Sequence, residues 1–431
     1  MNFLKKQSPV RIISLGFALV ILIGSVLLSL PCSIRDGVTL RYIDALYMST
    51  SAVCVTGLLT VDAGDTFTPL GQFFLGMLIQ VGGLGVTAVG TGVILAMGKK
   101  INLKARNLIR EAGNLDSGKG VIRFIRLVFL TTVTFELAGA ALSFLVFRKD
   151  FPPLKAAGVS LFHSVASFNN SGFDILGGGQ NLIPYQDDIL LNLVTCALVI
   201  FGGIGFLVIR EVIAKRFRWK KLSMHAKVVL FMSLVLTAAG TVLLKLTEDI
   251  TWMGAFFTSV SARTAGFSTF SLGSFSSAGL LTVIVLMVIG ASPGSTGGGI
   301  KTTTCYVLFE GIRSSATNTS EKAFRYAVPT DAFRKAAVIT LLAIGIVLSG
   351  TYILVILEPG VPFLDALFEM SSAFGTAGLS TGISAGLCDA AKILTILIMF
   401  IGRLGPLTIA SLWYFTKGER VSYPEGNIAI G

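Results

Sequence analysis

The stretch Ala45-Leu-Tyr-Met-Ser-Thr-Ser-Ala-Val-Cys-Val-Thr-Gly-Leu58 recurs in altered form three more times along the chain. Every copy has a small residue followed by an apolar pair, and roughly ten residues later a small or polar pair, a Gly, and then Leu or Phe. The other copies are residues 160–173, 255–267 and 366–379. One such match would mean little in a chain with 48 Gly, but four in register indicate an internal repeat.

The repeated stretch lies in uncharged runs that are too short to cross a bilayer, which needs about 20 apolar residues. Each run begins as a short amphipathic helix and then breaks at small residues around one Gly. Backbone that leaves helical geometry at membrane depth must be buried in protein or line a water-filled cavity. The runs therefore predict four re-entrant pore loops around a shared pore, with extracellular amphipathic loops as the alternative. They are residues 45–61, 156–173, 250–262 and 370–388.

Longer apolar runs flank each of these loops. The chain of 431 residues is 53% hydrophobic and 13% charged, with a mean hydropathy of +0.79, whereas soluble domains carry about 25% charged residues. This composition excludes a disordered chain, and five Cys in this length exclude a disulfide scaffold. Eight runs are predicted to span the membrane: 12–34, 66–98, 127–147, 189–209, 228–244, 264–300, 336–357 and 393–416.

The predicted fold is therefore an all-α polytopic membrane protein with eight transmembrane helices and four re-entrant pore loops. It consists of four span–pore-helix–span repeats around one central pore. A second Gly cluster follows each pore loop, beginning at Gly82, Gly202, Gly290 and Gly402. The predicted repeats are 10–100, 120–216, 224–310 and 334–416, followed by a tail at 417–431.

The distribution of charge predicts the orientation. The net charge is +12, and the excess of Lys and Arg lies in alternate connecting segments, whereas the intervening segments are richer in acids. By the positive-inside rule both termini are cytoplasmic and the pore loops enter from outside. A signal peptide is the alternative for residues 12–34, but that run exceeds the roughly 7–15 apolar residues of such a segment. The basic segments predict contact with membrane lipid and no nucleic-acid partner.

Four loops that present main-chain carbonyl oxygens to one axis suit cation conduction. Rings of carbonyls replace the hydration shell of potassium in known filters, and Gly permits the backbone conformations that this requires. An enzyme would need His, Cys or acids clustered within the spans. We find only Glu136, Lys301 and Arg403 there, with two His in the chain and no paired-Cys spacing. We therefore predict no enzymatic activity and no transition-metal site, and a purely structural scaffold leaves the four loops unexplained.

With these motifs the sequence resembles the Trk/Ktr/HKT superfamily of potassium transporters, and most of all the membrane subunit of bacterial Ktr systems. The resemblance covers nearly the whole chain, including the tail Tyr423-Pro-Glu-Gly-Asn-Ile-Ala-Ile-Gly431. It implies potassium uptake, and Gly57 favours potassium because some sodium-selective plant members have Ser at this position. Sodium or another monovalent cation remains the alternative. The implied potassium-binding filter comprises Val55, Thr56, Gly57, Asn170, Ser171, Gly172, Thr264, Ala265, Gly266, Thr376, Ala377 and Gly378.

Residues 289–302 interrupt the second span of the third repeat with a density of Gly and Pro that breaks helices. A phosphate-binding loop needs Lys directly after its last Gly, but Ile300 intervenes here and the context is a membrane span. The resemblance implies an intramembrane gating loop instead. A charge such as Arg403 in a span costs about 2.5–3.5 kcal/mol or more, so we expect it to bond this loop. The predicted gate comprises Gly290, Ala291, Ser292, Pro293, Gly294, Ser295, Thr296, Gly297, Gly298, Gly299, Lys301 and Arg403.

The resemblance also implies partners. These are a second copy of the chain in a homodimer, with the Gly431 tail at its interface, and a cytosolic nucleotide-binding regulatory ring of the Ktr type. The implied location is the cell membrane of a bacterium. No resident cofactor is expected: potassium is the transported ion, and sodium is a candidate activator.

Overall fold

The computed structural model describes residues 9–96, 120–329 and 331–411. Its described residues are almost entirely helical, with one small antiparallel hairpin formed by β1 (Lys322–Ala323) and β2 (Tyr326–Ala327). The ends of the first and fourth predicted repeats and the tail 417–431 lie outside the described residues, as do parts of the predicted spans 66–98 and 393–416. Short 3-10 helices occur at Pro31–Ser33, Ile183–Tyr185, Trp219–Lys221, Leu272–Ser274 and Ser384–Gly386.

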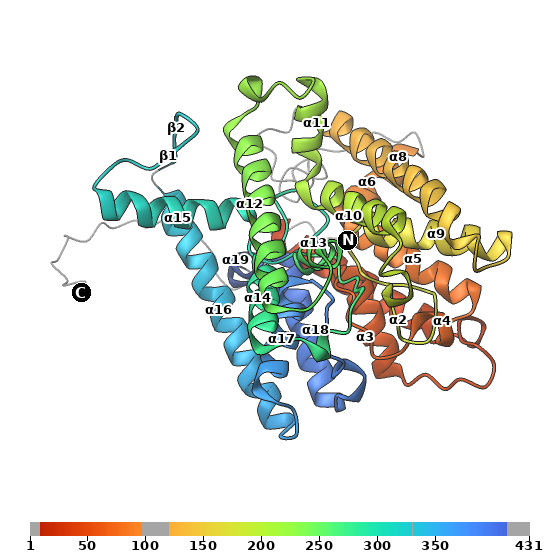
Figure 1. Cartoon of the computed structure of the whole chain (residues 1–431). Helices are drawn as coiled ribbons and strands as arrows, with labels where there is room; N and C mark the ends of the chain where they lie inside the picture. The colour runs from red at the N-terminus through yellow and green to blue at the C-terminus, as the bar shows by residue number, and fades with distance from the viewer. Residues whose placement is uncertain (1–8, 97–119, 330, 412–431) are drawn as a thin grey trace, which may run out of the picture.

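Each repeat begins with a long apolar helix (Figure 1). Four described helices are long and apolar enough to cross a membrane, and the bent pair α10–α11 is a fifth candidate. Large apolar side chains such as Leu130, Leu234 and Leu341 are exposed on their outer faces, as expected where lipid is the solvent. The four helices are α2 (Pro9–Leu28), α8 (Val121–Phe147), α12 (Met224–Thr247) and α16 (Ala332–Leu357).

A short pore helix follows each long one and overlaps the predicted re-entrant segment, although the first, second and fourth begin three, three and seven residues before that segment. Local sequence sets where these helices start: the Thr251 side chain caps the third by accepting a hydrogen bond from Gly254 N, and Pro153 opens the second. The first ends at Cys54 because Val55 takes a left-handed conformation. The pore helices are α3 (Tyr42–Cys54), α9 (Pro153–Phe168), α13 (Trp252–Ala262) and α17 (Phe363–Gly375).

The second predicted span of every repeat is broken into two helices, whereas the sequence predicted a break in the third repeat alone. Gly85, Gly205 and Gly405 interrupt the other three with φ angles of 85°, 96° and 91°, a region that L side chains avoid. At Gly205 the two halves are bent by 98°. The pairs are α5 (Pro69–Leu84) with α6 (Val86–Ala96), α10 (Ile189–Ile204) with α11 (Phe206–Ala214), α14 (Ser277–Val288) with α15 (Thr302–Thr317), and α18 (Asp389–Leu404) with α19 (Pro406–Ser411). A short helix α4 (Ala63–Thr66) precedes α5.

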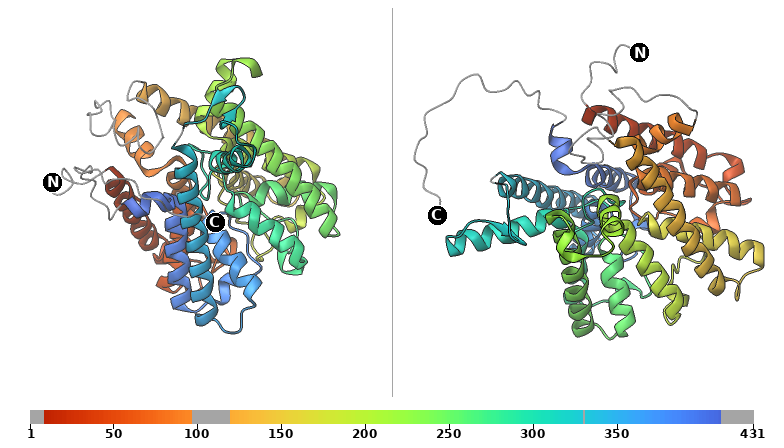
Figure 2. Two further views of the ribbon diagram at one scale, coloured as in Figure 1. Left: turned by 90° about the vertical axis from the view of Figure 1, so that its left-hand side faces the viewer. Right: turned by 90° about the horizontal axis from the view of Figure 1, so that it is seen from above.

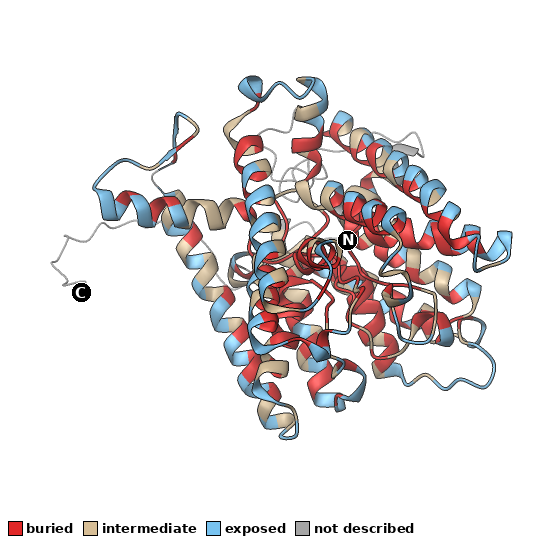
Figure 3. Ribbon diagram, in the orientation of Figure 1, coloured by how far each residue is buried: buried red, intermediate tan, exposed pale blue. Residues whose placement is uncertain are grey.

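The four repeats close into a ring through one recurring contact. The first half of each second span packs on the pore helix of the next repeat: α5 on α9, α10 on α13, α14 on α17, and α18 on α3. The buried residues gather at the centre, where the pore helices meet, and the outer faces of the long helices are exposed (Figures 2 and 3). Helix α15 departs from this pattern, because it projects from the body and packs only against α12 and α16 among the main contacts.

An ion pair joins the last repeat to the first. Lys392 Nζ on α18 lies 2.6 Å from Asp44 Oδ1 at the start of α3, and both side chains are more than nine-tenths buried. Arg41 also contacts Asp44. Burial opposes ionisation of Asp44, but its hydrogen bonds and charge attraction to Lys392 and Arg41 are stronger and lower its pKa. The ring is therefore closed by a paired buried charge as well as by apolar packing.

Candidate ion-conduction site

The four turns predicted as a filter meet at the centre of the ring. Each repeat Gly has a positive φ, from 68° to 97°. A β-carbon added to any of them would lie within 2.1–2.7 Å of a carbonyl oxygen of the next turn, so only Gly fits. The oxygens belong to Ser171 beside Gly57, Ala265 beside Gly172, Ala377 beside Gly266, and Thr56 beside Gly378.

The turns share one backbone plan, and the third is a variant of it. In the first turn Thr56 N donates to the carbonyl five residues earlier, Ser51 O of the pore helix, at 2.8 Å. Ser171 N and Ala377 N make the equivalent bond to the carbonyl five residues earlier at 2.9 Å. In the third turn Ala265 N donates to the carbonyl only four residues earlier, Ser261 O. The third copy is one residue shorter, so it needs no left-handed residue at Thr264. Val55, Asn170 and Thr376 adopt φ angles of 57°, 59° and 49° at the corresponding position.

The residues of these turns are buried, and all but one of their carbonyl oxygens lack a hydrogen-bond partner among the described residues. Within the described residues, Gly172 O accepts a hydrogen bond from Asn181 Nδ2 at 3.2 Å, and no hydrogen bond reaches the carbonyl of any other filter residue. Buried carbonyls are nearly always paired, because an unpaired one carries the cost of its lost hydration. A ring of such oxygens has the chemistry that replaces the hydration shell of a bare cation.

A cavity of about 300 Å³ lies directly above the ring and is lined by Gly57, Gly266 and Gly378. Asp62 and Asp174 also line it. Burial, with the nearby carboxylates of Asp62 and Asp65, raises the pKa of Asp174 to about 7. Acids at the mouth of a pore concentrate cations. Asp188 instead caps α10 by accepting a hydrogen bond from Leu191 N, and neither it nor Asp187 lines the cavity.

The predicted gate is a compact loop between α14 and α15, with a narrow neck. A β-carbon on Gly299 would lie 3.2 Å from the Cα and N of Gly290, so the two ends of the loop touch. Ile300 N donates to Val288 O, and Ala291 N to Gly298 O, across this neck. Lys301 Nζ donates to Gly297 O at 2.8 Å and so ties the base of α15 to the loop.

The loop crosses to the other repeats immediately below the filter. Ser292 N donates to Gly203 O at 3.0 Å, and Thr296 N to Gly202 O at 3.3 Å, both in the second repeat. Gly298 N donates to Oγ1 of the filter residue Thr376 at 2.9 Å. These bonds join one loop to two neighbouring repeats and to the filter itself.

Arg403 sits against this loop. Its Nη1 donates to Thr296 O, and its Nη2 donates to Gly82 O and, at 3.4 Å, to Gly83 O. The guanidinium therefore spans the loop of the third repeat and the break in α5 of the first. No salt bridge to an acid is found for it within the described residues. Its charge is held by main-chain oxygens of the loop and of the break in α5.

Several buried polar residues were missed by sequence reasoning, which took Glu136, Lys301 and Arg403 as the only charges inside the membrane domain. Glu369 of α17 is fully buried and accepts hydrogen bonds from the hydroxyls of Ser380 and Ser384. Lys392 is buried against Asp44. Both lie at predicted loop borders, so nothing in the local sequence distinguished them from solvated residues.

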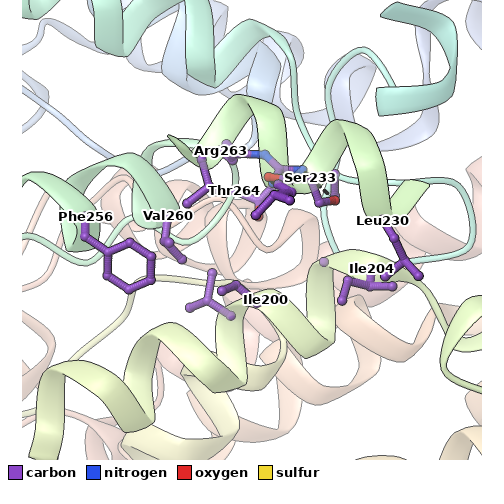
Figure 4. A pocket seen from close by; sticks show the side chains of 13 residues that line it. Ile200, Ile204, Leu230, Ser233, Phe256, Val260, Arg263 and Thr264 are labelled. Atoms are coloured by element: carbon purple, nitrogen blue, oxygen red, sulfur yellow. Dashed lines mark hydrogen bonds between the residues drawn. The ribbon is translucent and has the colours of Figure 1, made fainter. Parts of the chain in front are cut away.

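Arg263 was also missed, and it borders a second hollow. A side cavity of about 250 Å³ opens between α10, α12 and α13, next to Thr264 of the filter and Ala291 of the loop (Figure 4). Arg263 lies beside Ser233 there, with Nη1 3.3 Å from Ser233 O. The other residues that line this side cavity are mostly apolar, and none of them is an acid, unlike in the cavity above the ring.

The sequence model of the TrkH family, described as a cation transport protein, matches residues 12–247 and 221–415. The chain belongs to this family. This TrkH-family chain is 36% identical to the Ktr system potassium uptake protein B of Bacillus subtilis (strain 168), over 98% of this chain and 97% of that protein. It is 35% identical to the potassium/sodium uptake protein NtpJ of Enterococcus hirae, over 99% and 98% of the two chains.

A solved structure has the same fold. The crystal structure of the potassium transporter TrkH from Vibrio parahaemolyticus matches with a TM-score of 0.75 and 19% identity, covering 95% of this chain and 86% of that one. The TrkH-family chain is thus a multi-pass membrane protein of a transporter family and not an enzyme. The roles predicted for its filter and gate residues remain predictions at this point.

Proposed function

We propose that this chain takes up potassium across the cell membrane, with the central ring of carbonyl oxygens as its selectivity filter. The observation that carries this proposal is the ring itself: buried carbonyls from four turns that, with one exception, have no hydrogen-bond partner within the described residues. Relatives named as potassium uptake proteins over the full length support it. Eight spans, four re-entrant loops and cytoplasmic termini complete the arrangement.

Sodium is the alternative cation, and one relative is named a potassium/sodium uptake protein. Potassium is favoured because all four turns have Gly, which lets each turn present its carbonyls to the same axis and surround a cation from every side. A side chain at Gly57 would push against Ser171 O and open the ring on one side. Potassium selectivity depends on the number and arrangement of such oxygens.

The loop 289–301 acts as the gate in this proposal. It lies below the ring, is bonded to the second repeat and to Thr376, and carries no transmembrane helix of its own. Its narrow neck at Gly290 and Gly299 allows the loop to move without displacing α14 or α15. Arg403 holds it in place and repels cations when the loop is closed.

Regulation is proposed to come from partners. Relatives are named as proteins B and D of Ktr systems, which supports a separate regulatory subunit. We place a cytosolic nucleotide-binding ring beneath a homodimer of this chain, with sodium as an activator. Helix α15, which projects from the body and exposes Phe309 and Ile312, is available for such contacts.

Ion uptake by the purified chain in liposomes tests this proposal, with voltage clamped by an ionophore and potassium, sodium or ammonium supplied separately. We expect uptake of potassium to exceed that of the other two ions. Expression of this chain together with a Ktr regulatory subunit should restore growth of a potassium-uptake-deficient bacterium at micromolar to low-millimolar potassium. Larger sodium uptake would favour the alternative, and absence of both uptake and rescue would overturn the proposal.

A further inference from the structure

One filter carbonyl differs from all the others. Gly172 O of the second turn accepts a hydrogen bond from the side chain of Asn181, whereas no such bond is found for the other filter carbonyls in the described part of the chain. We infer that Asn181 is a specificity-determining residue, which fixes this oxygen and so favours potassium over sodium. The inference rests on the proposed role of the ring as an ion filter.

The Asn181 amide joins two turns of the ring. Its Nδ2 donates to Gly172 O at 3.2 Å, and its Oδ1 accepts from Ser268 N, just beyond the third turn, also at 3.2 Å. The next residue adds a main-chain bond, since Leu182 N donates to Ser268 O at 3.1 Å. The side chain therefore acts as a bridge between the second and third repeats at the outer edge of the filter.

The loop before Asn181 is shaped to deliver it to this position. Gly177, Gly178 and Gly179 all have positive φ angles, and the carboxylates of Asp65 and Asp62 accept hydrogen bonds from Gly178 N and Gly179 N, each at 2.8 Å. Asn181 itself has a φ of 51°, which Asn tolerates better than most L residues. It is half-buried and lines the cavity above the ring, on the path of an arriving ion.

The physical consequence concerns ion size. Sodium is smaller than potassium, so a filter holds it well only if its oxygens close in on it. An oxygen held by a hydrogen bond resists that movement, and it also gives part of its electron density to the N–H donor. Freeing Gly172 O should therefore improve the fit to sodium more than the fit to potassium. Loss of one hydrogen bond of this kind should change the ratio of potassium to sodium uptake by roughly 3- to 10-fold.

Two substitutions separate this role from a merely structural one. Asn181→Asp keeps an oxygen to accept from Ser268 N and tolerates the left-handed backbone, but it cannot donate to Gly172 O when ionised. Asn181→Gly keeps the backbone freedom and removes the side chain. Gln180→Glu is the matched control, because it adds the same charge one residue earlier on an exposed side chain.

The experiment measures the ratio of potassium to sodium uptake in liposomes at fixed voltage for these variants. The ratio is taken within one preparation, so a smaller folded fraction does not affect it. We expect Asn181→Asp and Asn181→Gly to lower the ratio by roughly 3- to 10-fold, and Gln180→Glu to leave it within about twofold because salt screens exposed charges. A wild-type ratio in Asn181→Asp would overturn the inference, as would an equal change in Gln180→Glu. A wild-type chain that carries neither ion would instead overturn the proposed function, and the inference with it.

Discussion

The filter turns and the loop beneath them are made of the same small residues, yet they treat their main-chain polar groups in opposite ways. The loop gives its N–H groups partners: Ser292 and Thr296 bond the second repeat, and Gly298 bonds Thr376. In the part of the chain that the structure describes, the filter leaves its carbonyl oxygens unpaired, apart from that of Gly172. The difference teaches that Gly content alone does not specify a role. Free carbonyl oxygens can bind a cation, whereas the loop groups named above bond other parts of the protein, which suits the loop to block a pore.

The largest expected effect comes from Gly378→Ala, which tests the filter side of this comparison. Gly378 has a φ of 82°, and a β-carbon there would lie 2.1 Å from Thr56 O. Backbone strain and this clash should reduce potassium uptake into liposomes by roughly 30-fold or more. Gly386→Ala is the control, because a β-carbon at Gly386 meets nothing within 4 Å. Equal uptake by the two variants at equal reconstitution would contradict the proposed filter.

Removal of the loop below the filter tests the second region of this comparison. Because Gly290 and Gly299 touch, deletion of residues 291–298 can be joined without separating α14 from α15. The variant should have a higher potassium flux, by roughly tenfold, if the closed state dominates in the intact chain. Combining the deletion with Gly378→Ala should abolish the gain, which shows that the flux uses the filter. Unchanged or lower flux in the deletion variant, with normal membrane expression, would refute a gate at this position.

Arg403→Gln should have a smaller effect of the same sign. It removes the charge and the charge-assisted bonds that hold Thr296 O and the break in α5. Bonds of this kind contribute about 1.5–3 kcal/mol, but the loop stays in place and the Gln amide can replace part of them, so we expect flux to rise by only roughly fivefold. Arg313→Gln is a suitable control, because Arg313 is half-exposed and pairs with Glu310 on α15. A drop in flux at normal expression would indicate that Arg403 stabilises the open state instead.

The smallest effect is expected where the two regions meet. Thr376→Val keeps the shape of a filter residue and removes the oxygen that accepts from Gly298 N. Loss of one neutral hydrogen bond should raise the flux by roughly 2- to 3-fold. Thr395→Val gives the comparison, because within the described residues the Thr395 hydroxyl bonds only Ala391 O of its own helix α18. If both variants behave alike in the same flux assay, the bond between filter and loop has no role in gating.

Much of the architecture could be predicted because it repeats. The four Gly at positions 57, 172, 266 and 378 share neighbours at fixed spacing, and the structure brings them into one ring. The second Gly clusters recur for a related reason. A β-carbon on Gly82, Gly202 or Gly402 would lie within about 2 Å of a carbonyl at the end of its own pore helix. In the third repeat Gly290 meets the loop residue Gly298 instead.

The rest could not be predicted from local patterns. Gly85, Gly205 and Gly405 lie in runs that are otherwise as apolar as a straight span, so their breaks left no signal in hydropathy. The bridge made by Asn181 and the burial of Arg263, Glu369 and Lys392 depend on which repeats become neighbours. That order is a property of the closed ring, and no single stretch of sequence contains it.

The ring closes within a single polypeptide, and this has a consequence for how the protein can change. In a pore assembled from identical subunits, one mutation alters every quadrant at once and is usually severe. Here each quadrant mutates alone, so a shortened third turn, a hydrogen bond to Gly172 O and a buried arginine on one side can coexist. Gene duplication followed by independent divergence of the four repeats would produce such asymmetry. One repeat would then be free to specialise in control while the others keep binding ions.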